Sequence, residues 1–178
     1  MNITRLVCLC VAALGICSSA LFAQESANPF TNAEKGLYGY ISGTVISSAE
    51  QVPESDYSFK ATPEVRSMGQ IFGHAADAQY MFCAMAAGET APVKGIEKSK
   101  TSKADLVQAL KEAQGYCMKV YSGLDDKQGA QLVEFMGRKM PKLTILSLNT
   151  AHLDEHYGNL VTYMRLKGIV PPTSAPRK

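Results

Sequence analysis

Four long segments of the chain repeat apolar residues with the 3.6-residue period of an α-helix, whereas sustained apolar–polar alternation, typical of β-strands, is almost absent. The segments run from about Asn32 to Glu50, from Arg66 or Ser67 to just before Gly88, from Ser102 to Gly123, and from Pro141 to Leu166. Amphipathic helices of this length are stabilised by burying their apolar stripes against one another. We therefore expect an all-α protein built from four packed helices.

Local signals support these boundaries. Ser102 followed by Asp105 is close to a capping box, and Pro141 suits the first turn of the last helix. Gly168 follows that helix, where a glycine commonly ends it. The segment from Asp125 to Arg138 has no clear period, so we predict irregular structure there, with a short strand, a helical turn or a lid as alternatives.

The first residues have the composition of an export signal. Arg5 supplies the positive charge, and an apolar stretch from Leu6 to about Ala23 contains small residues suited to cleavage. An uncleaved membrane anchor is the alternative, but the stretch is short and interrupted for that role. We expect a signal peptide at 1–23, a linker at 24–30, one domain at 31–172 and a tail at 173–178, in a periplasmic or secreted protein with no membrane segment after cleavage.

The composition excludes some classes of partner. About 155 residues would remain after cleavage, which is enough for one domain with a substantial core. Loss of Arg5 lowers the formal net charge from +2 to +1, and Lys and Arg are scattered rather than clustered. Nucleic-acid binding is therefore not expected. Gly39 and Gly43 in the first helix would permit close packing of a second copy, so a homodimer is a further possibility.

Two cysteines, Cys83 and Cys117, lie outside the expected signal peptide, each about 15 residues into its helix. If the second and third helices run parallel, with residues 88–101 as a crossover, a disulfide is feasible. If they form a hairpin, the cysteines lie about 15 Å apart along the axis, which is too far. Buried free thiols, common for cysteine in apolar surroundings, are the alternative. The lysines of the connecting loop are expected to be solvated charge.

Three histidines give the chain its most specific chemistry. His152 and His156 are four residues apart, so a helix places both rings on one face. That face is polar where core residues are expected, and His74 lies among apolar residues in the second helix. Three neutral imidazoles on one divalent cation, zinc or nickel first among the choices, would leave a coordination position open, as in catalytic sites. Separate histidines satisfied within the core are the alternative.

Nearby residues refine the metal hypothesis. Asp77, Asp154 and Glu155 could orient the rings, although the last two are expected to face solvent. The sequence from His152 to His156 also fits the inverted zinc-protease motif H-x-x-E-H, but no Asp or Glu follows to complete that site, so we reject a protease. Methionines near His74 make a copper site a minor option, core packing being the ordinary role of Met.

The ordered set of motifs resembles the DinB/YfiT-like family of metalloenzymes. The segment from Arg66 to His74, the H-x3-H of His152 and His156, and the ending from Tyr163 to Pro172 are similar to that family over about residues 31–172. The resemblance implies a single four-helix bundle with one divalent metal on His74, His152 and His156. It also implies activation of a small nucleophile, since some relatives use the metal to activate a low-molecular-weight thiol.

The function expected is therefore an exported metal-dependent enzyme that activates water or a small thiol for hydrolysis or transfer. An exported protein has no assured supply of reduced thiol, which makes metal-activated water a comparable option. A non-catalytic metal- or ligand-binding bundle is the alternative. The sequence identifies no substrate.

Overall fold

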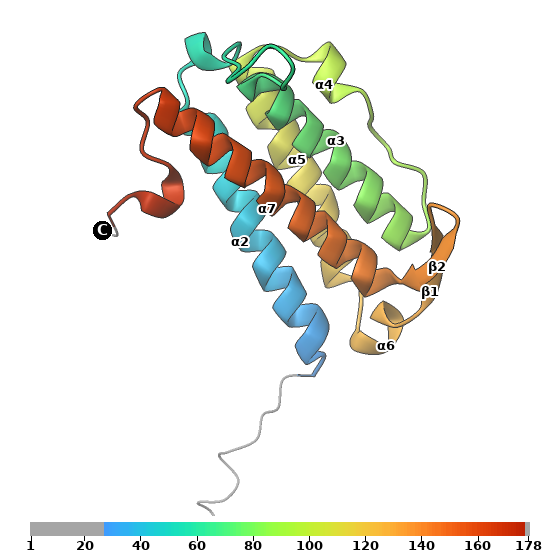
Figure 1. The fold of residues 1–178 in the computed structure, drawn as a ribbon. Helices are drawn as coiled ribbons and strands as arrows, with labels where there is room; N and C mark the ends of the chain where they lie inside the picture. Colours follow the sequence, from blue (N-terminus) through green and yellow to red (C-terminus); the bar gives the residue numbers. More distant parts are fainter. Residues whose placement is uncertain (1–26, 177–178) are drawn as a thin grey trace, which may run out of the picture.

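The computed structural model describes residues 27–176, in which four long helices pack side by side (Figure 1). These helices are α2 (Pro29–Gln51), α3 (Met68–Ala87), α5 (Lys103–Ser122) and α7 (Lys142–Leu166). The prediction of an all-α four-helix bundle is confirmed. The predicted signal peptide lies outside the described residues. Within them, no helix combines the length and apolar character that crossing a bilayer requires.

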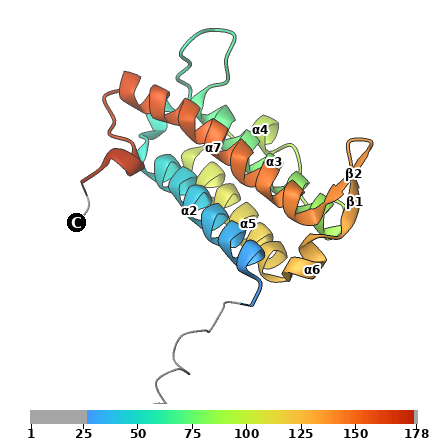
Figure 2. The same ribbon diagram turned by 60° about the horizontal axis from the view of Figure 1, so that its bottom comes forward.

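The helices follow an up-down-down-up order (Figures 1 and 2). A loop with a 3₁₀ turn, η1 (Glu54–Asp56), joins α2 to α3. The chain then returns along the outside of the bundle, through the short helix α4 (Ile96–Ser99), so that α5 starts at the same end as α3. As a result α3 and α5 are parallel neighbours, and α7 runs antiparallel to both.

The parallel pair carries a disulfide between Cys83 and Cys117, whose Cα atoms are 5.4 Å apart. Both cysteines are fully buried. The interpretation as buried free thiols is therefore wrong, because the crossover brings the two residues to the same height on neighbouring helices. The connecting segment is thus a crossover, which was one of the two arrangements that the sequence left open, and it contains the short helix α4, which was not predicted.

A small hairpin lies between α5 and α7. After the short helix α6 (Asp126–Gly129), strands β1 (Leu132–Phe135) and β2 (Arg138–Pro141) pair antiparallel, with Phe135 opposite Arg138. Met136 and Gly137 form the turn with φ of 50° and 77°. Our prediction of irregular structure is corrected here, since each element has only four residues and no period could identify it. Phe135 packs on Phe82 with 5.8 Å between ring centroids.

Helix ends differ little from their predicted positions. Ser67 forms a full capping box with Gln70, and Pro141 is the N-cap of α7 rather than its first residue. Pro29 and Phe30, expected in a linker, are helical. Thr173, expected in a tail, lies in the 3₁₀ turn η2 (Pro172–Ser174), where its Oγ1 is 2.7 Å from the hydroxyl of Tyr157.

The core lies between the four helices. The expected apolar stripe of α7 is buried, and Leu153 and Leu160 have no exposed surface. Tyr38 of α2 stacks on Tyr121 of α5, with 4.3 Å between ring centroids. A Cβ added at Gly39 or Gly43 would meet no atom within 4 Å, so neither glycine marks a close approach within the described chain.

Candidate metal centre

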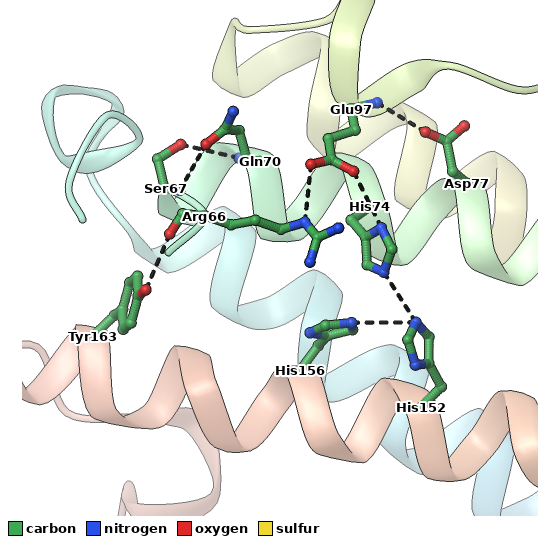
Figure 3. A network of polar contacts seen from close by, with 9 residues as sticks. All are labelled: Arg66, Ser67, Gln70, His74, Asp77, Glu97, His152, His156 and Tyr163. Carbon is green, nitrogen blue, oxygen red and sulfur yellow. Dashed lines mark hydrogen bonds and ion pairs between the residues drawn. The ribbon is translucent and has the colours of Figure 1, made fainter. Parts of the chain in front are cut away.

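The three histidines meet between α3 and α7, near the end at which α3 begins (Figure 3). His74 Nε2 lies 3.1 Å from His152 Nε2, which lies 3.2 Å from His156 Nε2. The three nitrogens that could act as ligands are all within 4.8 Å of one another. The structure thus brings together the three residues predicted from sequence. His156 is buried, whereas His74 is only partly buried, at the edge of the apolar face on which we had placed it.

The spacing of these nitrogens fits a small divalent cation. Zinc–nitrogen bonds of about 2.0–2.1 Å in a tetrahedron place pairs of ligand nitrogens about 3.3 Å apart. The Nε2–Nε2 separations of 3.1 Å between His74 and His152 and of 3.2 Å between His152 and His156 are close to that value. Three protein ligands of a tetrahedron leave a fourth position for water or substrate.

Proton accounting supports the same conclusion. His152 Nε2 contacts two other ring nitrogens, but a neutral ring nitrogen offers either one proton or one lone pair. Hydrogen bonding can therefore satisfy only one of these contacts well. A cation that accepts all three lone pairs would satisfy the three Nε2 atoms at once, so the cluster could hold a metal ion.

A carboxylate that the sequence did not identify lies behind His74. Glu97 Oε2 is 3.1 Å from His74 Nδ1, and Glu97 Oε1 is 2.9 Å from Nε of Arg66. Asp77, expected to orient a histidine itself, instead accepts hydrogen bonds from the backbone N–H groups of Ile96 and Glu97. Two signals in the sequence could have indicated this arrangement. Asp77 lies one helical turn after His74, and the loop after this helix contains the acidic residue Glu97.

The other two acids predicted near the rings have smaller roles. Glu155 is 69% exposed and its Oε2 lies 3.8 Å from His152 Nδ1, beyond hydrogen-bond distance. Asp154 is exposed. Both face solvent, as the sequence indicated. The polar stripe of α7 is the face that carries the two histidines together with Asn149, Asn159 and Tyr163. The sequence predicted that this stripe turns inward, but Asn159 is exposed, which corrects its assignment.

Farther along the same stripe, Asn149 serves the core rather than the metal cluster. Its Nδ2 donates to the hydroxyl of Tyr121 at 3.2 Å and faces the disulfide sulfurs. Tyr163, at the other end, donates to the backbone oxygen of Arg66 at 3.0 Å. The polar stripe of α7 therefore has structural partners at both ends, with the histidines between them.

A cleft of about 640 Å³ opens beside the histidines. His156 forms part of its wall, and Arg66, Lys60, Gln70 and Asn159 contribute polar groups. The cleft has room for a small molecule next to His156. Figure 3 shows the guanidinium of Arg66 between Glu97 and His156, at the side of the cluster.

The environment favours the neutral form of His152 and of His156. Burial lowers the pKa of His156 to about 4, and the neighbouring His152 and His74 add to this effect. Burial and the nearby His74 also lower the pKa of His152. Neutral imidazole is the form that binds metals, so the rings are ready to act as ligands at neutral pH.

These shifts predict how stability depends on pH in metal-free protein. Unfolded His156 takes up a proton near pH 6.5, whereas the folded protein resists protonation until about pH 4. The contribution of His156 to the free energy of unfolding is thus complete above pH 6.5 and declines toward pH 4, by about 2 kcal/mol between pH 7 and 5. Urea unfolding in a chelator would measure it. A His156→Asn variant should lack most of this decline, and an equal decline in both proteins would contradict the prediction.

The family model described as DinB superfamily matches residues 44–160. No match was found among the curated proteins. Similar solved structures include a DinB-like protein from Bacillus cereus ATCC 10987 (17% identity, TM-score 0.69, 76% of this chain and 91% of that one). Another is a DinB-like protein from Bacillus subtilis (21% identity, TM-score 0.67, 82% and 99%).

A third similar structure belongs to a mycothiol-dependent maleylpyruvate isomerase, with 12% identity and a TM-score of 0.60. The match covers 74% of this chain and 59% of that protein. At these identities the likeness concerns the fold alone.

Proposed function

The chain belongs to the DinB superfamily, and from that premise we propose that it is a metal-dependent enzyme with His74, His152 and His156 as ligands of one divalent cation, zinc or nickel. The observation that carries the proposal is that nitrogens of three histidines lie within 4.8 Å of one another, two of the pairs at the spacing of metal ligands, beside an open cleft. When bound, the cation would lower the pKa of a small nucleophile toward neutrality and polarise a substrate oxygen.

The residues of the chain would supply the rest. Neutral His152 and His156 would hold the cation without competing protonation at pH 7, and the cleft would seat a small substrate against His156. Arg66 lies where it could stabilise negative charge that develops on that substrate. Hydrolysis by activated water fits this arrangement.

Export of the protein is part of the proposal. The apolar N-terminal stretch after Arg5 has the pattern of a signal peptide, and the Cys83–Cys117 disulfide is of the kind that persists in oxidising compartments. Both observations favour a periplasmic or secreted location. In an oxidising compartment reduced thiols are scarce, so water is the first candidate for the nucleophile. A small thiol is the second candidate, favoured by the fold shared with a mycothiol-dependent isomerase.

Metal content tests the ligand set. We expect the wild-type protein to bind about one Co²⁺ or Zn²⁺, and His152→Ala to bind it about 100-fold more weakly because one of three ligands is lost. Asp154→Ala, two residues along α7 and exposed, is the matched control and should bind as the wild type does. Equal affinity in wild type and His152→Ala would remove the site.

A second measurement separates catalysis from mere binding. Addition of azide, which does not reduce the disulfide, to the Co²⁺-loaded protein should change its visible absorption if a coordination position is open. An unchanged spectrum would indicate a closed site and favour the non-catalytic metal-binding bundle.

A further inference from the structure

The crossover between α3 and α5 delivers a carboxylate to the proposed metal centre. We infer that Glu97, on α4, is a positioning residue that fixes the tautomer and the orientation of His74. We also infer that Gly73 and Asp77, on α3, hold the backbone of Glu97 in place. This inference rests on the proposed function in so far as His74 is a metal ligand. The contacts of Gly73 and Asp77 with the backbone of residues 96 and 97 do not depend on a metal.

Glu97 determines which nitrogen of His74 carries the proton. Its carboxylate cannot donate, so the 3.1 Å contact requires His74 to donate through Nδ1–H. The lone pair is then on Nε2, the atom that faces His152. The second carboxylate oxygen accepts from Arg66 Nε at 2.9 Å, which restricts rotation of the carboxylate. Histidine ligands in metal sites commonly donate their other N–H to such a partner.

The backbone of Glu97 is itself held by α3. Both oxygens of Asp77 accept hydrogen bonds of 2.9 Å, one from the N–H of Ile96 and one from the N–H of Glu97. These bonds satisfy donors at the start of α4 that have no partner within the helix. The side chain of Ile96 is buried beneath the same turn.

Gly73 permits the close approach of the two helices. A Cβ at this position would lie 2.7 Å from Cα of Glu97 and 3.0 Å from its nitrogen, which is closer than packing allows. The residue just before His74 therefore has no side chain, and the residue one turn after it anchors α4. Together they place Glu97 beside the Nδ1 edge of His74, as Figure 3 shows for Asp77, Glu97 and His74.

Cobalt affinity, followed by visible absorption, tests the effect on the site. Glu97→Ala should bind Co²⁺ about 10- to 100-fold more weakly than wild type, the range typical for loss of a ligand-orienting partner. Glu97→Gln, whose amide oxygen can still accept the Nδ1 proton, should be intermediate. Glu155→Ala is the matched control. Glu155 is also an acid close to a proposed ligand, with its Oε2 3.8 Å from His152 Nδ1, but it makes no hydrogen bond to that ring. Its affinity should change less than about threefold.

Gly73→Ala supplies an independent variant, because it keeps the carboxylate and displaces the backbone that carries it. We expect its affinity to fall as well. If Glu97→Ala binds Co²⁺ as tightly as wild type, or if Glu155→Ala is weakened equally, the inference is overturned while the ligand set stands.

The tautomer of His74 gives a readout without metal. In ¹⁵N NMR spectra of metal-free protein, wild-type His74 should carry its proton at Nδ1, beside Glu97, with the lone pair on Nε2. Glu97→Ala should shift the population toward Nε2–H, and Glu155→Ala should not. An unchanged tautomer in Glu97→Ala would overturn the inference. Absence of cobalt binding by wild type would instead refute the proposed function, and the tautomer comparison would still decide the role of Glu97.

Discussion

Replacing Cys83 and Cys117 together with alanine is expected to lower the free energy of unfolding by about 4 kcal/mol. The disulfide spans a sequence separation of 34 residues, and cross-linking a loop of that length removes about this much chain entropy from the unfolded state. Stability of native domains is only about 5–15 kcal/mol, so the loss is a large fraction of the total. Urea unfolding of both proteins, with and without dithiothreitol, measures the difference.

Dithiothreitol also provides the internal control. It should weaken the wild-type protein by a similar amount and leave the double alanine variant unchanged, which separates this bond from the cysteines at residues 8, 10 and 17. Equal stability of the two oxidised proteins would show that the bond contributes little to the native state.

Leu153→Ala is expected to have the second largest effect, a loss of about 3 kcal/mol within the 2–5 kcal/mol range for buried leucine. Leu153 has no exposed surface. In the sequence of α7 it lies between His152 and His156, and its side chain is on the apolar face of the helix, next to the face that carries the two histidines. Truncation leaves a cavity in a closely packed core. The thermal midpoint should fall by about 10 °C for a domain of this size.

Leu148→Ala, on the same helix, is the matched comparison. Leu148 is 38% exposed, so its truncation removes less buried surface and should cost less than about 1 kcal/mol. Similar thermal midpoints for the two variants would mean that α7 is not packed as described. A fall in metal affinity of Leu153→Ala would further show that core packing sets the positions of His152 and His156.

The main features of the fold could be predicted because they depend on local patterns. The apolar period of α7 and the caps at Ser67 and Ser102 act within one or two turns, so they can be read in sequence. The hairpin could not be predicted, because strands of four residues are too short to show a period of apolar residues. The direction of α5 relative to α3 was also undetermined, because the connecting loop is long enough for either arrangement.

The site shows the same division between local and distant information. His152 and His156 are paired by helical spacing alone. Their meeting with His74 was one of two alternatives that the residues left open, and the family resemblance favoured it. Glu97 was missed because it lies in a segment that contains three lysines and no apolar repeat. Glu97 contacts His74, which lies 23 residues earlier in the chain, only because the crossover folds back over Gly73.

The route of the crossover also affects how the molecule would respond to a break in its backbone. The stretch after Gly88 runs along the outside of the bundle before α4 begins. A cut there would not release either fragment, because Cys83 on one piece remains bonded to Cys117 on the other. His74 would belong to the first fragment and its carboxylate partner to the second, so the centre would then be assembled from two polypeptides joined by sulfur.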